Sequence, residues 1–221
     1  MPDRAQYKNF YLLLLLLSYF IANACLAETN INGYFATVSM AFTILVCGNM
    51  IERSKFIACI ITPFGLLAIL GFVLVATLKP SNNLYVAHFT VNGIFMVAIT
   101  FFQLKSCAQR SEITVNTLLG AICAYLMIGL TWTYFDLALA HAIPGAFYPE
   151  PATETFRHNL DYYTYFSFCT LTTLGFGDII PKSSLARTFT WAEAVIGQIY
   201  LAVWISQLVA IHTVQIFQRK E

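Results

Sequence analysis

The chain has 221 residues, of which 58% are hydrophobic and 10% charged, and its mean hydropathy is +0.68. This composition excludes a soluble globule with an ordinary polar surface and is typical of an integral membrane protein. The net charge of +1 provides no basic face to neutralise phosphates, so nucleic acid is excluded as a partner. The six cysteines show no metal-ligand spacing, and we expect reduced core thiols and no cofactor.

Six apolar stretches are long enough to cross the hydrocarbon core of a bilayer, which takes about 20 helical residues. They cover residues 10–26, 34–50, 56–78, 84–104, 115–140 and 185–217. The sequence therefore predicts an all-α, polytopic membrane protein with six transmembrane helices. Residues 1–27 also fit a cleaved signal peptide, because Arg4 and Lys8 precede a leucine run and small residues follow it. We favour a retained first helix.

The basic residues predict the orientation. With both termini in the cytoplasm, eight of the 12 lysines and arginines fall on the inner side and four on the outer side. We therefore expect a multi-pass protein of the cell membrane with cytoplasmic termini.

The fourth stretch, 84–104, contains His88 and Asn92 but no arginine. Steep voltage sensing needs several charges that cross the membrane field, each contributing about 2.3 kcal/mol per 100 mV. We therefore expect no intrinsic voltage gating.

Residues 172–178, here called the filter segment, provide the chemistry of an ion path. They are Thr172, Thr173, Leu174, Gly175, Phe176, Gly177 and Asp178. A dehydrated cation needs rings of oxygen ligands, which backbone carbonyls and one threonine hydroxyl can supply. Aiming successive carbonyls at one axis requires left-handed backbone at alternate positions, and Gly175 and Gly177 have that spacing. Each chain adds one oxygen per ring, so a complete cage needs four chains around an axis.

The filter segment follows an amphipathic run, 162–171, that is too short to span a bilayer. Residues 115–217 as a whole resemble the pore module of the tetrameric potassium-channel family, with an outer helix, a re-entrant pore helix, a filter and an inner helix. The layout resembles a bacterial six-helix group whose front domain lacks gating arginines. The resemblance implies a four-helix, voltage-sensor-like transmembrane domain at 1–112 and a pore domain at 113–221.

The resemblance also implies a role for individual residues. K⁺ would bind at the carbonyls of Thr173, Leu174, Gly175, Phe176 and Gly177, with the Thr173 hydroxyl as a further ligand. The residues that would support the filter are Thr172, Asp178, Tyr165, Phe166, Cys169 and Thr170. In the inner helix, Gly197 would be a hinge, the cavity would be lined by Gln198, Leu201 and Ile205, and Val209 would be the gate.

Three departures from the family concern the surroundings of the filter. The family has two collar tryptophans where this chain has Tyr165 and Phe166, and a filter tyrosine where it has Phe176. We expect aromatic packing in place of that tyrosine's hydrogen bond, with Tyr165 bonding Asp178. Cys169 replaces a glutamate that braces the filter in some relatives.

The remaining polar residues of the pore module lead to three expectations. We expect Asp136 and His141 at the solvated outer interface, followed by a turret loop at 141–160. Glu193 lies inside the membrane, so we expect it to bond to the back of the pore helix. For Gly197, close helix packing and hinging are equally compatible with the sequence.

We interpret the chain as a homotetrameric, potassium-selective channel in the lipid bilayer, passive and without intrinsic voltage gating, with K⁺ as the permeant ion. The alternatives are a weakly selective cation channel and a non-conducting regulatory subunit. An enzyme is disfavoured, because the candidate groups lack nucleophile-base or metal spacing. Those groups are His88, Asp136, His141 and Glu193.

Overall fold

The computed structural model describes residues 7–26, 63, 82–109, 114–150 and 156–218. Within them the chain forms helices α1 (Lys8–Leu26), α4 (Asn82–Ala108), α5 (Val115–Ala142), α6 (Phe156–Leu171) and α7 (Ser184–Gln218), and strands β1 (Phe147–Tyr148) and β2 (Ile180–Pro181). The predicted stretches 34–50 and 56–78 lie outside the described residues, apart from position 63.

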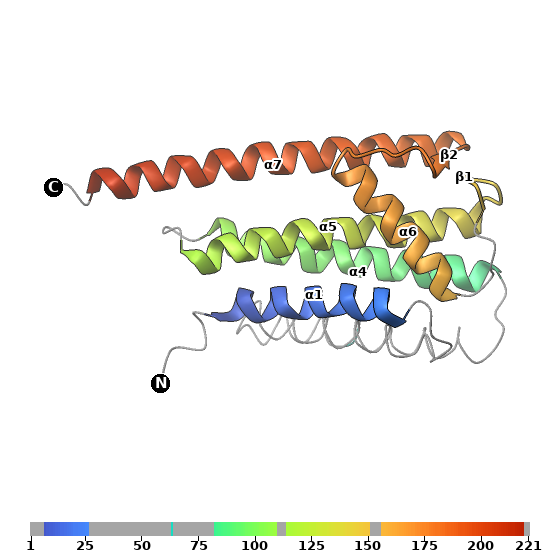
Figure 1. Ribbon diagram of the computed structural model, residues 1–221, viewed down its shortest axis with the longest axis horizontal. Coiled ribbons are helices and arrows are strands. Elements are labelled where there is room, and N and C mark those ends of the chain that lie inside the picture. Colours follow the sequence, from blue (N-terminus) through green and yellow to red (C-terminus); the bar gives the residue numbers. More distant parts are fainter. Residues whose placement is uncertain (1–6, 27–62, 64–81, 110–113, 151–155, 219–221) are drawn as a thin grey trace.

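The four long helices lie roughly along one direction, and the shorter α6 crosses them obliquely (Figure 1). Helix α5 is central, since it contacts α1, α4, α6 and α7. Helices α1 and α5 run one way and α4 and α7 the other, so the start of α1 and the end of α7 lie at the same end of the bundle (Figure 1).

Within the described residues, helices form at the predicted stretches 10–26, 84–104, 115–140 and 185–217. Helices α4 and α5 are each long and apolar enough to cross a membrane, while α1 contains a shorter apolar stretch and α7 has 35 residues. The described residues therefore support a mostly helical protein with two candidate membrane-spanning helices. The predicted total of six includes stretches that lie outside them.

Local sequence explains both ends of α5. Thr114 caps its start, where the side-chain oxygen accepts a hydrogen bond from the Thr117 backbone N–H at 3.2 Å. Pro144 follows its end, and a proline disfavours helical backbone at the residue before it. The chain then turns at Gly145, whose φ of 75° suits glycine.

The outer loops differ from the expectations in two respects. The chain is not purely α-helical, because β1 pairs antiparallel with β2 in the register Phe147 to Pro181 and Tyr148 to Ile180. Strands of two residues are too short to leave a periodic pattern in the sequence. The predicted turret, 141–160, is also shorter than expected, because α6 begins at Phe156. No proline or glycine lies between position 151 and the filter segment, so no helix-breaking residue prevents α6 from beginning early.

Helix α1 packs on α5 and reaches α6. The rings of Phe20 and Phe168 meet edge to face with centroids 5.3 Å apart. Phe168 in turn covers Gly129 of α5, where an added Cβ would lie 2.7 Å from its ring. Glycine at this position therefore lets α6 approach α5 closely.

A polar network joins α1, α4 and α5 near the start of α1. The side chain of Asn9 donates to the Asn116 backbone carbonyl at 2.7 Å, and the Asn116 side-chain oxygen accepts from the Asn9 backbone N–H at 3.0 Å. Gln103 of α4 donates to the Asn9 side-chain oxygen and to the Gly120 carbonyl, both at 3.2 Å. These bonds attach α1 and α4 to α5.

Candidate functional site

The backbone of the filter segment alternates in handedness. Thr173, Gly175 and Gly177 have φ values of 59°, 56° and 78°, whereas Leu174 and Phe176 are not among the positive-φ residues. The two glycines confirm the left-handed positions predicted from their spacing. Thr173 was not predicted to be left-handed, and a β-branched residue rarely adopts this conformation.

The N–H groups at the start of the filter segment bond back to α6. The pairs are Thr172 to Phe168 at 3.1 Å, Thr173 to Thr170 at 2.9 Å, and Leu174 and Gly175 to Cys169 at 2.8 and 3.2 Å. Within the described part of the chain, no backbone N–H donates to the carbonyls at positions 173–177. These oxygens therefore remain available to another ligand.

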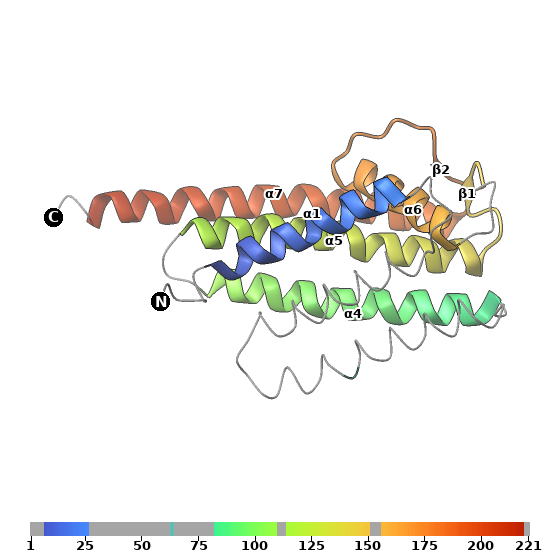
Figure 2. The same cartoon turned by 60° about the horizontal axis from the view of Figure 1, so that its bottom comes forward.

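The filter segment lies at the open side of the chain. It extends away from the helices between α6 and β2 (Figure 2). Leu174 and Phe176 are 58% and 66% exposed, and a Cβ built at Gly175 or Gly177 would meet nothing within 4 Å. One chain thus forms only one wall of any ion path along this segment.

Tyr165 holds the outer end of the filter segment. Its hydroxyl donates to Oδ2 of Asp178 at 2.6 Å, which confirms the predicted hydrogen bond. This bond to the carboxylate raises the pKa of the Tyr165 hydroxyl, so the hydroxyl stays protonated and able to donate. The ring also stacks on Phe176 with an interplanar angle of 5°. Phe166, the other collar position, packs instead against Phe147 at 5.2 Å, because it faces the buried side of α6.

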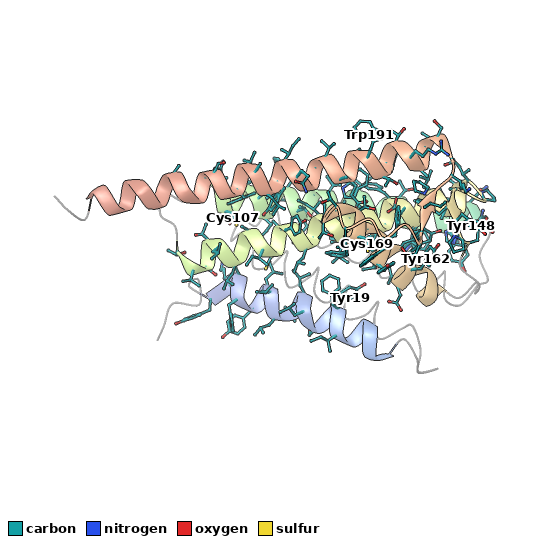
Figure 3. The ribbon with its side chains drawn as sticks, turned by 45° about the horizontal axis from the view of Figure 1, so that its top comes forward. Tyr19, Cys107, Tyr148, Tyr162, Cys169 and Trp191 are labelled. Atoms are coloured by element: carbon teal, nitrogen blue, oxygen red, sulfur yellow. The ribbon has the colours of Figure 1, made fainter. Side chains whose placement is uncertain are left out.

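The other predicted support residues act mainly through their backbones. Cys169 is buried, and its carbonyl accepts the two N–H groups described above; Figure 3 shows it beside the filter segment. Thr170 accepts one N–H, and the Thr172 hydroxyl donates to the Phe168 carbonyl at 2.6 Å. The C-terminal end of α6, where a helix carries partial negative charge, therefore lies at the base of the filter segment.

On α7, the predicted hinge is a site of close approach. A Cβ at Gly197 would press on the Leu171 carbonyl oxygen at the end of α6 and lie 3.0 Å from Leu171 Cδ1. The next residue, Gln198, donates to the Thr173 hydroxyl at 3.5 Å, and Leu201 is 38% exposed. The side chains of Ile205 and Val209 lie outside the described residues, so their roles stay predictions.

Two ionisable groups lie behind α6. Glu193 is fully buried, and its Oε1 lies 2.6 Å from the Ser167 hydroxyl, which confirms that it bonds to the back of this helix. Asp136 is also fully buried, so the expected solvated position was wrong. The aromatic residues near Asp136 in α5 suggested the interface between membrane and water, but α6 and α7 cover this position. His141 is half-buried, and its Nδ1 lies 2.9 Å from the Leu137 carbonyl oxygen, which accepts a hydrogen bond from it.

Comparison with known proteins bears on the second half of the chain. Residues 112–213 match a family described as an ion channel. This range contains α5, α6, the filter segment and most of α7. No curated protein matches the chain. The C-terminal half of the chain is therefore similar to an ion-channel domain, which supports ion-channel activity in a membrane.

Sequence reasoning missed Ser167 and Tyr125. Ser167 is four residues from both Tyr163 and Leu171, and all three are buried on one face of α6. That spacing could have placed Ser167 opposite the inner helix. The Tyr125 hydroxyl donates to the Leu171 carbonyl at 3.3 Å, and no pattern in the sequence marks this contact.

Proposed function

We propose that the chain is one subunit of a homotetrameric, potassium-selective channel in the cell membrane. It would conduct K⁺ passively, with six transmembrane helices, both termini in the cytoplasm and no enzymatic activity. The observation that carries the proposal is the backbone of the filter segment. Its handedness alternates, its first N–H groups bond to α6, and its carbonyls are left for a ligand.

The chemistry of this backbone suits a dehydrated monovalent cation. Carbonyl oxygens are neutral dipoles that can replace the hydration shell of K⁺ without binding it too tightly to leave. Four copies of the segment would present successive rings of such oxygens, and the Thr173 hydroxyls would add the innermost ring. The partial negative charge at the end of α6 would favour the cation just below them.

The exposure of the chain favours a tetramer. The filter segment is open on one side, and α7 exposes a series of apolar side chains. Trp191 projects from α7 away from the bundle (Figure 3) and is 60% exposed, and Ile199 is 56% exposed. Neighbouring subunits would cover this face and complete the rings of oxygen.

The front helices favour a channel that is not intrinsically voltage-gated. Helix α4 contains no arginine, and its one lysine, Lys105, lies in the last turn. A charge at the end of a helix crosses little of the membrane field, so its contribution to gating is small.

The test is K⁺ against Na⁺ flux in liposomes that contain the purified protein, with Gly177→Ala alongside. Alanine at the left-handed φ of 78° should cost about 1 kcal/mol in each chain. Over four chains this is about 4 kcal/mol, so K⁺ flux should fall by about a thousandfold. Gly145→Ala is the matched control, because its φ of 75° imposes similar strain outside the filter segment.

Each other outcome favours a different function. Equal flux of K⁺ and Na⁺ would favour a weakly selective cation channel, in which Phe176 lets the filter relax. Absence of flux would favour a non-conducting regulatory subunit. Equal flux in Gly177→Ala and the unmodified protein would exclude the filter segment as the ion path.

A further inference from the structure

The Ser167 hydroxyl lies within hydrogen-bond distance of two acceptor oxygens but has only one hydrogen to donate. The Ser167 hydroxyl oxygen lies 2.6 Å from Oε1 of Glu193 and 2.7 Å from the Gly129 carbonyl oxygen. All of these groups are buried between α5, α6 and α7. A hydroxyl carries a single hydrogen, and a carbonyl oxygen can only accept.

Two acceptors at hydrogen-bond distance from one hydroxyl favour a second hydrogen in this contact. If Ser167 donates to the Gly129 carbonyl, the 2.6 Å approach of Glu193 requires the carboxyl group to donate to the Ser167 oxygen. If Glu193 is ionised, Ser167 donates to it, and the Gly129 carbonyl and the hydroxyl oxygen face each other at 2.7 Å without a hydrogen. The geometry fits a protonated Glu193.

Asp136 adds a second carboxyl group to this site. It is fully buried, neither of its oxygens has a hydrogen-bond partner, and Oε2 of Glu193 also has none. The two carboxyl groups interact electrostatically. Neither forms an ion pair with a lysine, arginine or histidine among the described residues. Two like charges without a counterion are costly to bury, so the pair holds protons in preference to charge.

The other titratable groups that face the pair are phenols. Tyr163 of α6 interacts with Asp136, and Tyr125 of α5 interacts with Glu193. Phenols are neutral at physiological pH and supply no compensating positive charge.

We propose that Glu193 and Asp136 form a proton-binding site behind the pore helix, and that loss of its proton lowers K⁺ conduction. This regulation rests on the proposed channel function. The link is α6, which carries Ser167 and, two residues later, the Cys169 carbonyl that holds Leu174 and Gly175. When Glu193 ionises, Ser167 turns its hydrogen to the carboxylate and loses its bond to Gly129. The resulting repulsion displaces α6 from α5 and moves the base of the filter segment.

The first test is K⁺ flux in liposomes as a function of pH. Buried carboxyl groups titrate as much as 3–5 units above their solution values, so the range should reach about pH 10. We expect K⁺ flux of the unmodified protein to fall by about tenfold as the pH rises. This is the change expected if the proton affinity of the site differs by about one pKa unit between the conducting and non-conducting states. Glu193→Gln should show no such fall, because its amide donates to Ser167 at every pH.

Asp136→Asn should reduce the fall, because it removes the neighbouring charge. Glu150→Gln is the matched control, since it removes an exposed carboxyl group of the outer loop and should leave the pH profile unchanged. An unchanged pH profile in both Glu193→Gln and Asp136→Asn would overturn the proposed regulation.

Infrared spectroscopy tests the proton site without flux. A protonated carboxylic acid has a C=O stretching band that a carboxylate lacks. At neutral pH the unmodified protein should show such a band, and the double variant Asp136→Asn/Glu193→Gln should lose most of it. A band of equal intensity in the double variant would overturn the proton site. If the unmodified protein conducts no K⁺ at any pH, the proposed function fails, and the infrared band decides the proton site independently.

Discussion

Gly197→Ala tests whether this glycine allows the close approach of two helices or acts as a hinge within one. Its added Cβ would lie 3.0 Å from Leu171 Cδ1 and 3.3 Å from the Leu171 carbonyl carbon, and would press on the carbonyl oxygen. The side chain could move, but the carbonyl is held by the Tyr125 hydroxyl at 3.3 Å. The backbone at the end of α6 must therefore shift.

The expected magnitude combines two opposing effects. Overpacking costs about 1–3 kcal/mol, and alanine favours a helix over glycine by about 1 kcal/mol. The free energy of unfolding should thus fall by about 1 kcal/mol per chain. Because Leu171 adjoins the filter segment, the K⁺ to Na⁺ flux ratio should fall as well.

The assay is denaturant unfolding together with K⁺ and Na⁺ flux. Ala202→Gly, at an exposed position of the same helix, measures the helix preference alone and should cost about 1 kcal/mol. A gain of about 1 kcal/mol in Gly197→Ala, with an unchanged flux ratio, would refute the packing argument. A change in channel opening alone, with stability and selectivity unaffected, would favour the hinge.

Two further predictions concern the ends of the pore module. Tyr165→Phe removes the hydroxyl that holds Asp178, so K⁺ flux should decay faster during prolonged conduction. Tyr162→Phe is the control. Equal decay in both variants would contradict the bracing role of Tyr165. Asn116→Ala removes the side-chain acceptor of the Asn9 N–H, and chemical denaturation should show a loss of about 1 kcal/mol. Unchanged stability of this variant would show that the network does not attach α1 to α5.

The sequence predicted the parts of the fold that depend on composition and regular spacing. The long apolar stretches at 84–104, 115–140 and 185–217 became α4, α5 and α7 with slightly extended ends. The left-handed backbone at Gly175 and Gly177 followed from their alternate positions and from the steric freedom of glycine. These features are local, so they could be predicted without knowledge of the neighbouring helices.

The features that were missed depend on contacts between distant residues. Burial of Asp136 results from the way α6 and α7 pack over α5, which no local pattern encodes. The partner of Glu193 was predicted only as the back of α6, and Ser167 was identified by the structure. The positive φ of Thr173 likewise depends on the bonds that hold the filter segment to α6.

The β1–β2 ladder has a mechanical consequence. Its pairing of Phe147 with Pro181 fastens the chain before α6 to the chain after the filter segment, and the Lys182 N–H donates to the Ala146 carbonyl at 2.7 Å beside it. A pull on the start of α7 therefore passes directly into the loop after α5. The ladder provides this path without involving α6 or the filter segment, which lie between the two strands in the sequence. A displacement of α7 at this end should therefore move the loop after α5 with it.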